Sequence, residues 1–156
     1  MMINETSKRV IYFREHDAKV VGKGSFYLDQ IVWLNGDQVV LGESVGFNFG
    51  CYVNGYGGLT IGDRSRIGPL STIHTANHVF DDPDVPLLEQ GWIKQPVTIG
   101  EDCWVAMSVC VLPGVTIGDR CVIGAGSVVT KDIPPDSVAV GNPCRVIRNR
   151  RAGRSG

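Results

Sequence analysis

Aliphatic residues recur every six positions through the second half of the chain. Residues 97–132 divide into six blocks of six: VTIGED, CWVAMS, VCVLPG, VTIGDR, CVIGAG and SVVTKD. The third position of every block is a β-branched aliphatic residue: Ile99, Val105, Val111, Ile117, Ile123 and Val129. The first position is small or β-branched, and glycine often occupies the fourth. Such a fixed period indicates an architecture of stacked repeating units.

Each block has the pattern of a short strand followed by a turn. The first and third positions lie two apart, so their side chains point to one face of a strand. Gly, Asp and Asn after the third position favour a turn. One such strand cannot bury its apolar face alone, but strands wound into a coil and stacked can. With three strands per coil, residues 18 apart would stack, placing Ile99 on Ile117 and Cys103 on Cys121.

The same pattern extends in both directions from these blocks. Toward the N-terminus the aliphatic positions in phase are Ile61, Ile67, Ile73 and Val79, preceded by Leu41, Phe47 and Val53. Residues 54–58 hold a two-residue excess, and residues 80–95 show no repeat, which predicts a loop extruded from one coil. After Val129 the phase breaks at residues 132–135, and we expect it to resume at Val140 and Val146.

These boundaries predict an all-β fold, a parallel β-helix with one extruded loop at about 80–95. A chain of 156 residues has room for one domain of ordinary size. We expect an irregular N-terminal segment at 1–20, the β-helix domain at 21–148 and a flexible basic tail at 149–156.

Composition and charge exclude several classes of protein. The chain has 15 basic and 16 acidic residues and a net charge of −1, which disfavours a nucleic-acid binder. No apolar run reaches about 18 residues, so we expect no membrane span. The N-terminus has no apolar signal region, which favours the cytoplasm. Five cysteines without a Cys-x-x-Cys pair indicate small buried residues instead of disulfides or a zinc site.

Five further motifs follow one another in a fixed order. They are TANH (75–78), PVTIGEDCWV (96–105), LPGVTIGD (112–119), GAGSVVTKDIP (124–134) and GNPCRVIR (141–148). With the hexads, this series resembles the left-handed β-helix, or hexapeptide-repeat, acyltransferases, and the galactoside, maltose and polysaccharide O-acetyltransferases in particular. The resemblance implies a left-handed coil, a homotrimer with active sites between neighbouring subunits, and acetyl-CoA as co-substrate.

The resemblance aligns His78 with the catalytic histidine of that family. Its implied role is general base: it takes the proton of an acceptor hydroxyl, which then attacks the thioester carbonyl of acetyl-CoA directly. Backbone N–H groups of the coil would stabilise the resulting oxyanion. His74 lies four positions earlier, about 13 Å away on an extended strand. A shared metal ion is therefore not expected, and His16 lies in the irregular start.

The resemblance also implies where CoA binds. The matching positions are Met107, Ala125, Thr130, Lys131, Arg145 and Arg148. Ala125 would offer a backbone group to the pantetheine arm, while Lys131 and the arginines would contact phosphates. Met107 stands where relatives often have serine, so a hydroxyl contact is lost there. The alternative for the arginines is a solvated basic tail.

Two residues are candidates for the acceptor side. Trp104 occupies an outward position, where it is expected in a subunit interface or in a wall of the acceptor or pantetheine groove, and the two are compatible if the active site lies between subunits. Asn54 begins the glycine-rich excess and matches a sugar-binding asparagine of galactoside-type relatives, displaced by one hexad; the alternative is a turn residue. The acidic acceptor-binding residue of those relatives has no counterpart here.

The resulting functional prediction is a CoA-dependent O-acetyltransferase that modifies a hydroxyl of a sugar or polysaccharide. Two alternatives stay open: an N-acetyltransferase acting on an amino sugar, and a non-catalytic β-helix scaffold. Scaffolds of that kind repeat one polar residue down a face, and the outward residues Trp104, Cys110, Val122 and Val128 do not form such a ladder.

Overall fold

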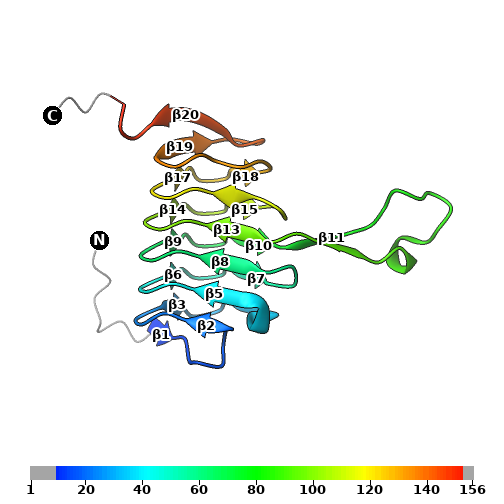
Figure 1. Ribbon diagram of the computed structural model, residues 1–156, viewed down its shortest axis with the longest axis horizontal. Coiled ribbons are helices and arrows are strands. Elements are labelled where there is room, and N and C mark those ends of the chain that lie inside the picture. The colour runs from blue at the N-terminus through cyan, green and yellow to red at the C-terminus, as the bar shows by residue number, and fades with distance from the viewer. Residues whose placement is uncertain (1–9, 153–156) are drawn as a thin grey trace.

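Residues 10–152, which the computed structural model describes, wind into a three-sided stack of coils with one long arm (Figure 1). Each coil contributes one short strand to each of three sheets, and strands of successive coils pair in parallel. Within this part of the chain the helical segments are two 3₁₀ turns, η1 (Gly36–Gln38) and η2 (Leu87–Glu89). The predicted β-helix is confirmed, and its left-handed winding stays a prediction.

The three sheets are named in the order in which each coil visits them. The first sheet comprises β1 (Val10–Tyr12), β3 (Phe26–Leu28), β6 (Gly46–Phe47), β9 (Arg66–Ile67), β14 (Trp104–Val105), β17 (Val122–Ile123), β19 (Ser137–Val140) and β20 (Arg145–Asn149). The second sheet comprises β4 (Val32–Leu34), β7 (Tyr52–Asn54), β10 (Thr72–His74), β15 (Cys110–Val111) and β18 (Val128–Val129). The third sheet comprises β2 (Val20–Val21), β5 (Val39–Leu41), β8 (Leu59–Ile61), β13 (Val97–Ile99) and β16 (Thr116–Ile117).

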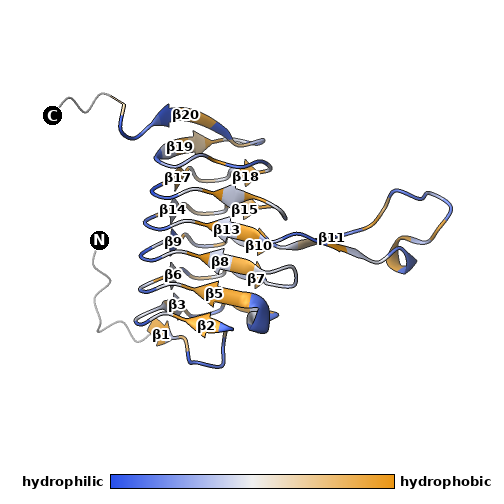
Figure 2. Ribbon diagram, viewed as in Figure 1, coloured by the Kyte–Doolittle hydropathy of each residue, from blue (hydrophilic) through white to orange (hydrophobic). Residues whose placement is uncertain are grey.

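The strand register agrees with the stacking predicted from the hexads. Ile99 pairs with Ile117, and corresponding aliphatic positions of the other two sheets pair in the same way. Cys103 and Cys121 lie buried side by side in successive coils. Removing one such aliphatic side chain from water stabilises the fold by roughly 1.5–3 kcal/mol. The repeated inward position therefore supplies the core, whereas the turns that join the third sheet to the first are hydrophilic (Figure 2).

Aromatic side chains cover the N-terminal end of the stack. Phe13 lies 4.8 Å from Trp33 and 5.9 Å from Phe47 between ring centres. The Trp33 indole also donates a hydrogen bond of 2.7 Å to the backbone carbonyl of Asp17. Because an end coil has no neighbour to cover its apolar interior, this cluster closes the core at that end.

The extruded segment is longer than the sequence pattern predicts, and it is a hairpin. Strand β11 (Ala76–His78) pairs antiparallel with β12 (Trp92–Lys94), and the hairpin projects far from the stack (Figure 1). Val79 therefore does not continue the coil, as its hexad phase suggested. The coil leaves its regular path directly after β10, because Thr75 is buried and binds the neighbouring corner.

The prediction for the last coil was also wrong in phase. Ile133 and Ala139 are the buried residues that pair with Ile117 and Ile123. Val140 and Val146, which were expected in the core, are exposed. The turn between Val129 and Ile133 spans four positions, against six between Val111 and Ile117 in the preceding coil. This coil is therefore two residues shorter, which shifts the inward position. The predicted tail at 149–156 extends beyond the described residues.

The three corners of the coil differ in size. At the second–third corner the chain passes through residues 35–38, then residues 55–58, and then the hairpin before it reaches the third sheet. The first–second corner carries Met107 and Ala125, and the third–first corner carries charged residues such as Glu101. Along residues 10–152 there is no helix with the length and apolar character needed to cross a bilayer.

Candidate functional site

His78 lies where the hairpin leaves the stack. It is the last residue of β11 and pairs directly with Trp92 of β12. The imidazole and indole rings face one another with centres 3.7 Å apart and planes 34° apart. The Nδ1 atom of His78 is buried and has no hydrogen-bond partner among residues 10–152. A buried polar atom in this state calls for a partner from outside the described chain.

Tyr56 and Lys94 extend the series of ring contacts that begins with His78 and Trp92. The Tyr56 ring meets Trp92 edge to face, with ring centres 6.0 Å apart. The Lys94 ammonium lies 3.7 Å from the centre of the Tyr56 ring, within the range of a cation–π contact. Tyr56 and Lys94 also line a cavity of about 310 Å³ beside the second–third corner.

Asn54 holds the corner beneath the hairpin. Its side-chain oxygen accepts hydrogen bonds from the Asn35 amide, at 2.8 Å, and from the backbone N–H of Tyr56, at 3.1 Å. Its backbone carbonyl accepts the hydroxyl of Thr75 at 2.8 Å. Asn54 also pairs with His74, whose ring stacks on Tyr52 at 5.0 Å. These hydrogen bonds stabilise the corner and occupy both oxygen atoms of Asn54. Its side-chain NH₂ group is the part that could still donate a hydrogen bond to a ligand.

Three of the predicted CoA residues share the first–second corner. Met107 and Ala125 precede β15 and β18, and the Gly126 N–H donates to the Met107 carbonyl at 3.0 Å. Arg145 pairs with Val140 one coil further on. All three predicted residues are exposed, so this corner offers backbone groups beside a positive charge to a bound molecule.

The remaining predicted residues lie elsewhere on the stack. Thr130 and Lys131 follow β18, so they lie at the second–third corner, the edge that also carries the hairpin. Trp104 is 57% exposed on the first sheet, in one column with Val122, Val138 and Arg148. The structure thus separates the predicted site into two groups at opposite edges of the second sheet, with His78 at one edge and Ala125 at the other.

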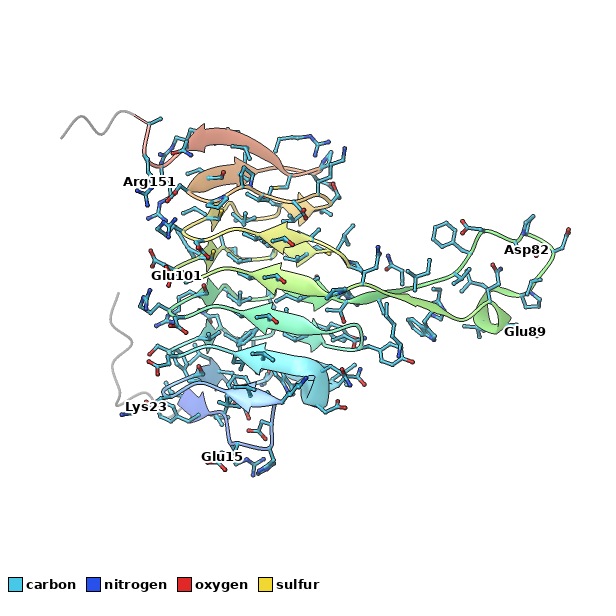
Figure 3. The ribbon with its side chains drawn as sticks, viewed as in Figure 1. Glu15, Lys23, Asp82, Glu89, Glu101 and Arg151 are labelled. Carbon is cyan, nitrogen blue, oxygen red and sulfur yellow. The ribbon has the colours of Figure 1, made fainter. Side chains whose placement is uncertain are left out.

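The third–first corner holds a network of ion pairs. The Asp136 carboxylate accepts from Arg120 at 2.7 Å and pairs with Arg151 at 2.9 Å. These two guanidinium groups, Arg120 first, hold the pKa of Asp136 at about 2. Figure 3 places Glu101 and Arg151 on this side of the stack, opposite the hairpin tip with Asp82 and Glu89. The network is remote from His78 and is structural.

Cys51 and Cys144 do not offer a nucleophile to this site, and Cys121, whose Sγ contacts the Pro134 carbonyl, lies at the third–first corner with the ion-pair network. Burial raises the pKa of the Cys51 thiol to about 11, and it also raises that of Cys144. A neutral buried thiol is unreactive. Among residues 10–152, no three His, Cys, Asp or Glu side chains lie together in a way that could hold a metal ion.

Sequence reasoning did not identify Trp92, Tyr56 and Lys94 as site residues. Trp92 and Lys94 lie in the segment without hexads, where no periodicity assigns a face to a side chain. Tyr56 lies within the two-residue excess at 54–58. The excess itself was visible in the sequence, and it marked the place where the coil departs from its regular course.

Comparison with known proteins matches the hexads to a described family. Residues 96–131 match the family "Bacterial transferase hexapeptide (six repeats)". The chain is 38% identical over 146 residues to the galactoside O-acetyltransferase of Escherichia coli K12, covering 93% of this chain and 70% of that enzyme. Several further curated relatives are longer, and the chain spans 56% of their length.

Solved structures give the same result. The maltose O-acetyltransferase of Clostridium difficile 630 is 41% identical, with a TM-score of 0.77 over 83% of this chain and 68% of that one. A hexapeptide-repeat acetyltransferase of Vibrio cholerae, solved with acetyl-CoA, is 30% identical, with a TM-score of 0.79 over 86% and 73% of the two chains. The chain therefore belongs to the hexapeptide-repeat acetyltransferases, the enzyme family of these galactoside and maltose O-acetyltransferases.

Proposed function

We propose that this enzyme transfers an acetyl group from acetyl-CoA to a hydroxyl of a sugar or polysaccharide, with His78 as the general base. The observation that carries the proposal is the position of His78 at the root of the hairpin. There the imidazole is held against Trp92, and its buried Nδ1 has no partner among the described residues. The names of the relatives support the two substrates: acetyl-CoA in the Vibrio cholerae structure, and galactosides or maltose as acceptors.

The proposed reaction is a direct transfer in which His78 moves one proton. One imidazole nitrogen accepts the proton of the acceptor hydroxyl as its oxygen bonds to the thioester carbonyl carbon. The carbonyl oxygen carries the negative charge of the tetrahedral intermediate, which backbone N–H groups would stabilise. When the intermediate collapses, the C–S bond breaks, and the imidazolium returns its proton to the sulfur. An ester and CoA result, without a covalent enzyme intermediate.

The two groups of predicted residues support an active site shared between protomers. His78, Thr130 and Lys131 lie at one edge of the second sheet, and Met107 and Ala125 at the other. One acetyl-CoA molecule would meet both groups if the edge of one protomer faces the opposite edge of the next. A closed ring of such head-to-tail contacts is a cyclic oligomer. We therefore propose a homotrimer with one site at each of its three interfaces.

Within that site, the residues have distinct proposed roles. The exposed backbone at Ala125 and Met107 would contact the pantetheine arm. Lys131, Arg145 and Arg148 would bind the phosphates of CoA, for which Arg offers a planar pair of donors and Lys a point charge. Trp104, exposed on the face that carries Arg148, would form a wall of the groove.

The test is CoA release, measured as free thiol, with a panel of neutral sugars, oligosaccharides and amino sugars. We expect release with hydroxyl acceptors and mass spectra showing an O-acetyl ester that dilute base removes. Products acetylated only at nitrogen, and stable to that treatment, would show that the acceptor is an amino sugar and would overturn the proposed substrate. Absence of acetyl transfer to any member of the panel would overturn it as well.

A further inference from the structure

Along residues 10–152 the coil is enlarged at a single corner, in three successive turns. In the N-terminal coils, paired residues of neighbouring strands are twenty positions apart in the sequence, as with Leu41 and Ile61. In the C-terminal coils they are eighteen apart, as with Ile99 and Ile117. Each N-terminal coil thus has two residues more than an eighteen-residue coil, and these fall between the second and third sheets, at residues 35–38 and 55–58. The hairpin is inserted at the same corner of the next coil. Corners elsewhere keep the regular hexad spacing up to Ile123.

These enlarged turns surround the cavity of about 310 Å³. Each turn contributes to its lining: Asn35, Asp37 and Gln38 from the first, Tyr56 and Gly57 from the second, and Lys94 from the hairpin. The walls carry amide, carboxylate, ammonium and phenol groups. These groups together can donate to and accept from several hydroxyls, and the Tyr56 ring offers an apolar face. A small number of polar groups that converge beside an aromatic ring is typical of a binding site for a small polar molecule.

The floor of the cavity is held rigidly. The Gly57 N–H donates to the Thr75 hydroxyl at 2.7 Å, and that hydroxyl in turn donates to the Asn54 carbonyl at 2.8 Å. Thr75 is fully buried. A Cβ at position 57 would lie 2.0 Å from the Thr75 carbonyl oxygen, so only glycine permits this close approach of the two turns.

Aromatic contacts connect the cavity with the proposed general base. The ring centres of His78 and Trp92 are 3.7 Å apart, and those of Trp92 and Tyr56 are 6.0 Å apart. The imidazole and the Tyr56 ring are therefore no more than about 10 Å apart, roughly the length of a disaccharide.

We propose that this cavity is an acceptor subsite, which binds a sugar residue adjacent to the one whose hydroxyl reaches His78. The inference rests on the proposed function and names its substrate class: an oligosaccharide of two or more sugar units, or the end of a polysaccharide. Lys94, Gln38 and Asp37 contact hydroxyls of the bound residue, and Tyr56 packs against its ring face. The reacting sugar is held beside Trp92.

The experiment compares KM and kcat for methyl glucoside, methyl galactoside, maltose, lactose and maltotriose in the wild type and in Lys94→Met and Gln38→Ala. For the wild type we expect a KM at least about tenfold lower for the best oligosaccharide than for the matching methyl glycoside. Each variant should raise the oligosaccharide KM about tenfold, and it should leave the methyl-glycoside and acetyl-CoA values within twofold. Lys23→Met, which removes the same charge on the far side of the stack, serves as the matched control and should change none of them.

Two results would overturn the subsite, and they differ in their meaning. If methyl glycosides and oligosaccharides are acetylated with equal KM, and the variants change both equally or neither, the subsite is wrong while sugar acetylation stands. If the wild type acetylates no sugar of the panel, the proposed function fails, and the subsite fails with it. Melting temperatures of all variants, expected within a few degrees of the wild type, separate these results from misfolding.

Discussion

The imidazole of His78 and the indole of Trp92 face one another across the hairpin, with ring centres 3.7 Å apart. The contact restricts the ring plane of the proposed base, and it depends on the antiparallel register that places these two residues opposite each other. We therefore expect Trp92 to be a positioning residue, which acts through its contact with the proposed base.

Trp92→Ala should lower kcat about tenfold or more, because a base that is displaced or rotates reacts less often in the right geometry. Trp92→Phe should recover most of the loss, since a phenyl ring can still stack on the imidazole. Ile93→Ala, an exposed neighbour on the same strand, is the control. Steady-state kinetics at saturating acetyl-CoA measure the effect, and an unchanged kcat for Trp92→Ala would disprove the positioning role.

Shared active sites can be tested by mixing two defective chains. A His78→Ala protomer lacks the base at one edge, and an Arg145→Ala/Arg148→Ala protomer lacks phosphate contacts near the other. Each parent enzyme should be nearly inactive at acetyl-CoA concentrations below the variant KM. Random trimers from a one-to-one mixture should regain about a quarter of wild-type activity. An interface is intact when the double-arginine variant supplies the His78 edge and the His78→Ala variant supplies the opposite edge, which is one of four equally frequent pairings.

The mixed oligomers are prepared by refolding the two chains together or by co-expressing them, so that every subunit combination can form. Light scattering should give the mass of three chains for each parent and for the mixture. A trimer that shows no recovery would place both groups of residues in one protomer. A monomeric mass with full activity would contradict the shared site itself.

Arg145→Ala and Lys131→Ala should each raise the KM for acetyl-CoA more than the KM for the acceptor. One charge-assisted contact is worth about 1.5–3 kcal/mol, which corresponds to about a ten- to a hundred-fold change. Arg64→Ala removes an exposed guanidinium at the third–first corner and should leave both constants unchanged. CoA titration calorimetry gives an independent reading, and wild-type affinity in both variants would refute the phosphate contacts.

The Asp136 network predicts a specific acid sensitivity. Its pKa is held at about 2 in the folded chain, against an ordinary value of 3.8. A depressed folded pKa means that Asp136 stabilises the fold fully above pH 4 and loses this contribution as the pH falls toward 2. The melting temperature of the wild type should therefore fall more steeply between pH 4 and pH 2 than that of Asp136→Asn. Asp81→Asn, at the hairpin, should follow the wild-type curve, and parallel curves for all three proteins would contradict the prediction.

The sequence predicted the coil well wherever neighbouring residues alone decide the structure. Ile99, Ile117 and their counterparts each repeat the same local choice, so the period gives the strands, their register and the core. It failed where a contact between coils decides, as at Thr75, which ends the coil before Val79, and at Ile133, which a shortened turn after Val129 brings into the stack two residues early. Trp92 and Tyr56 could not be assigned for the same reason, since their faces depend on the hairpin and on an enlarged corner.

The central claim is that His78 is the general base, and the most direct test is kcat for His78→Ala. The variant should keep the wild-type fold, with a stability change within about 1 kcal/mol, because His78 lies at the edge of the stack and leaves no core cavity. Its kcat should fall about a hundred- to ten-thousand-fold, with little change in the KM for acetyl-CoA. His74→Ala, which removes a ring stacked on Tyr52, should have a much milder effect. Wild-type kcat in a folded His78→Ala enzyme, or loss of activity in His74→Ala alone, would contradict the account.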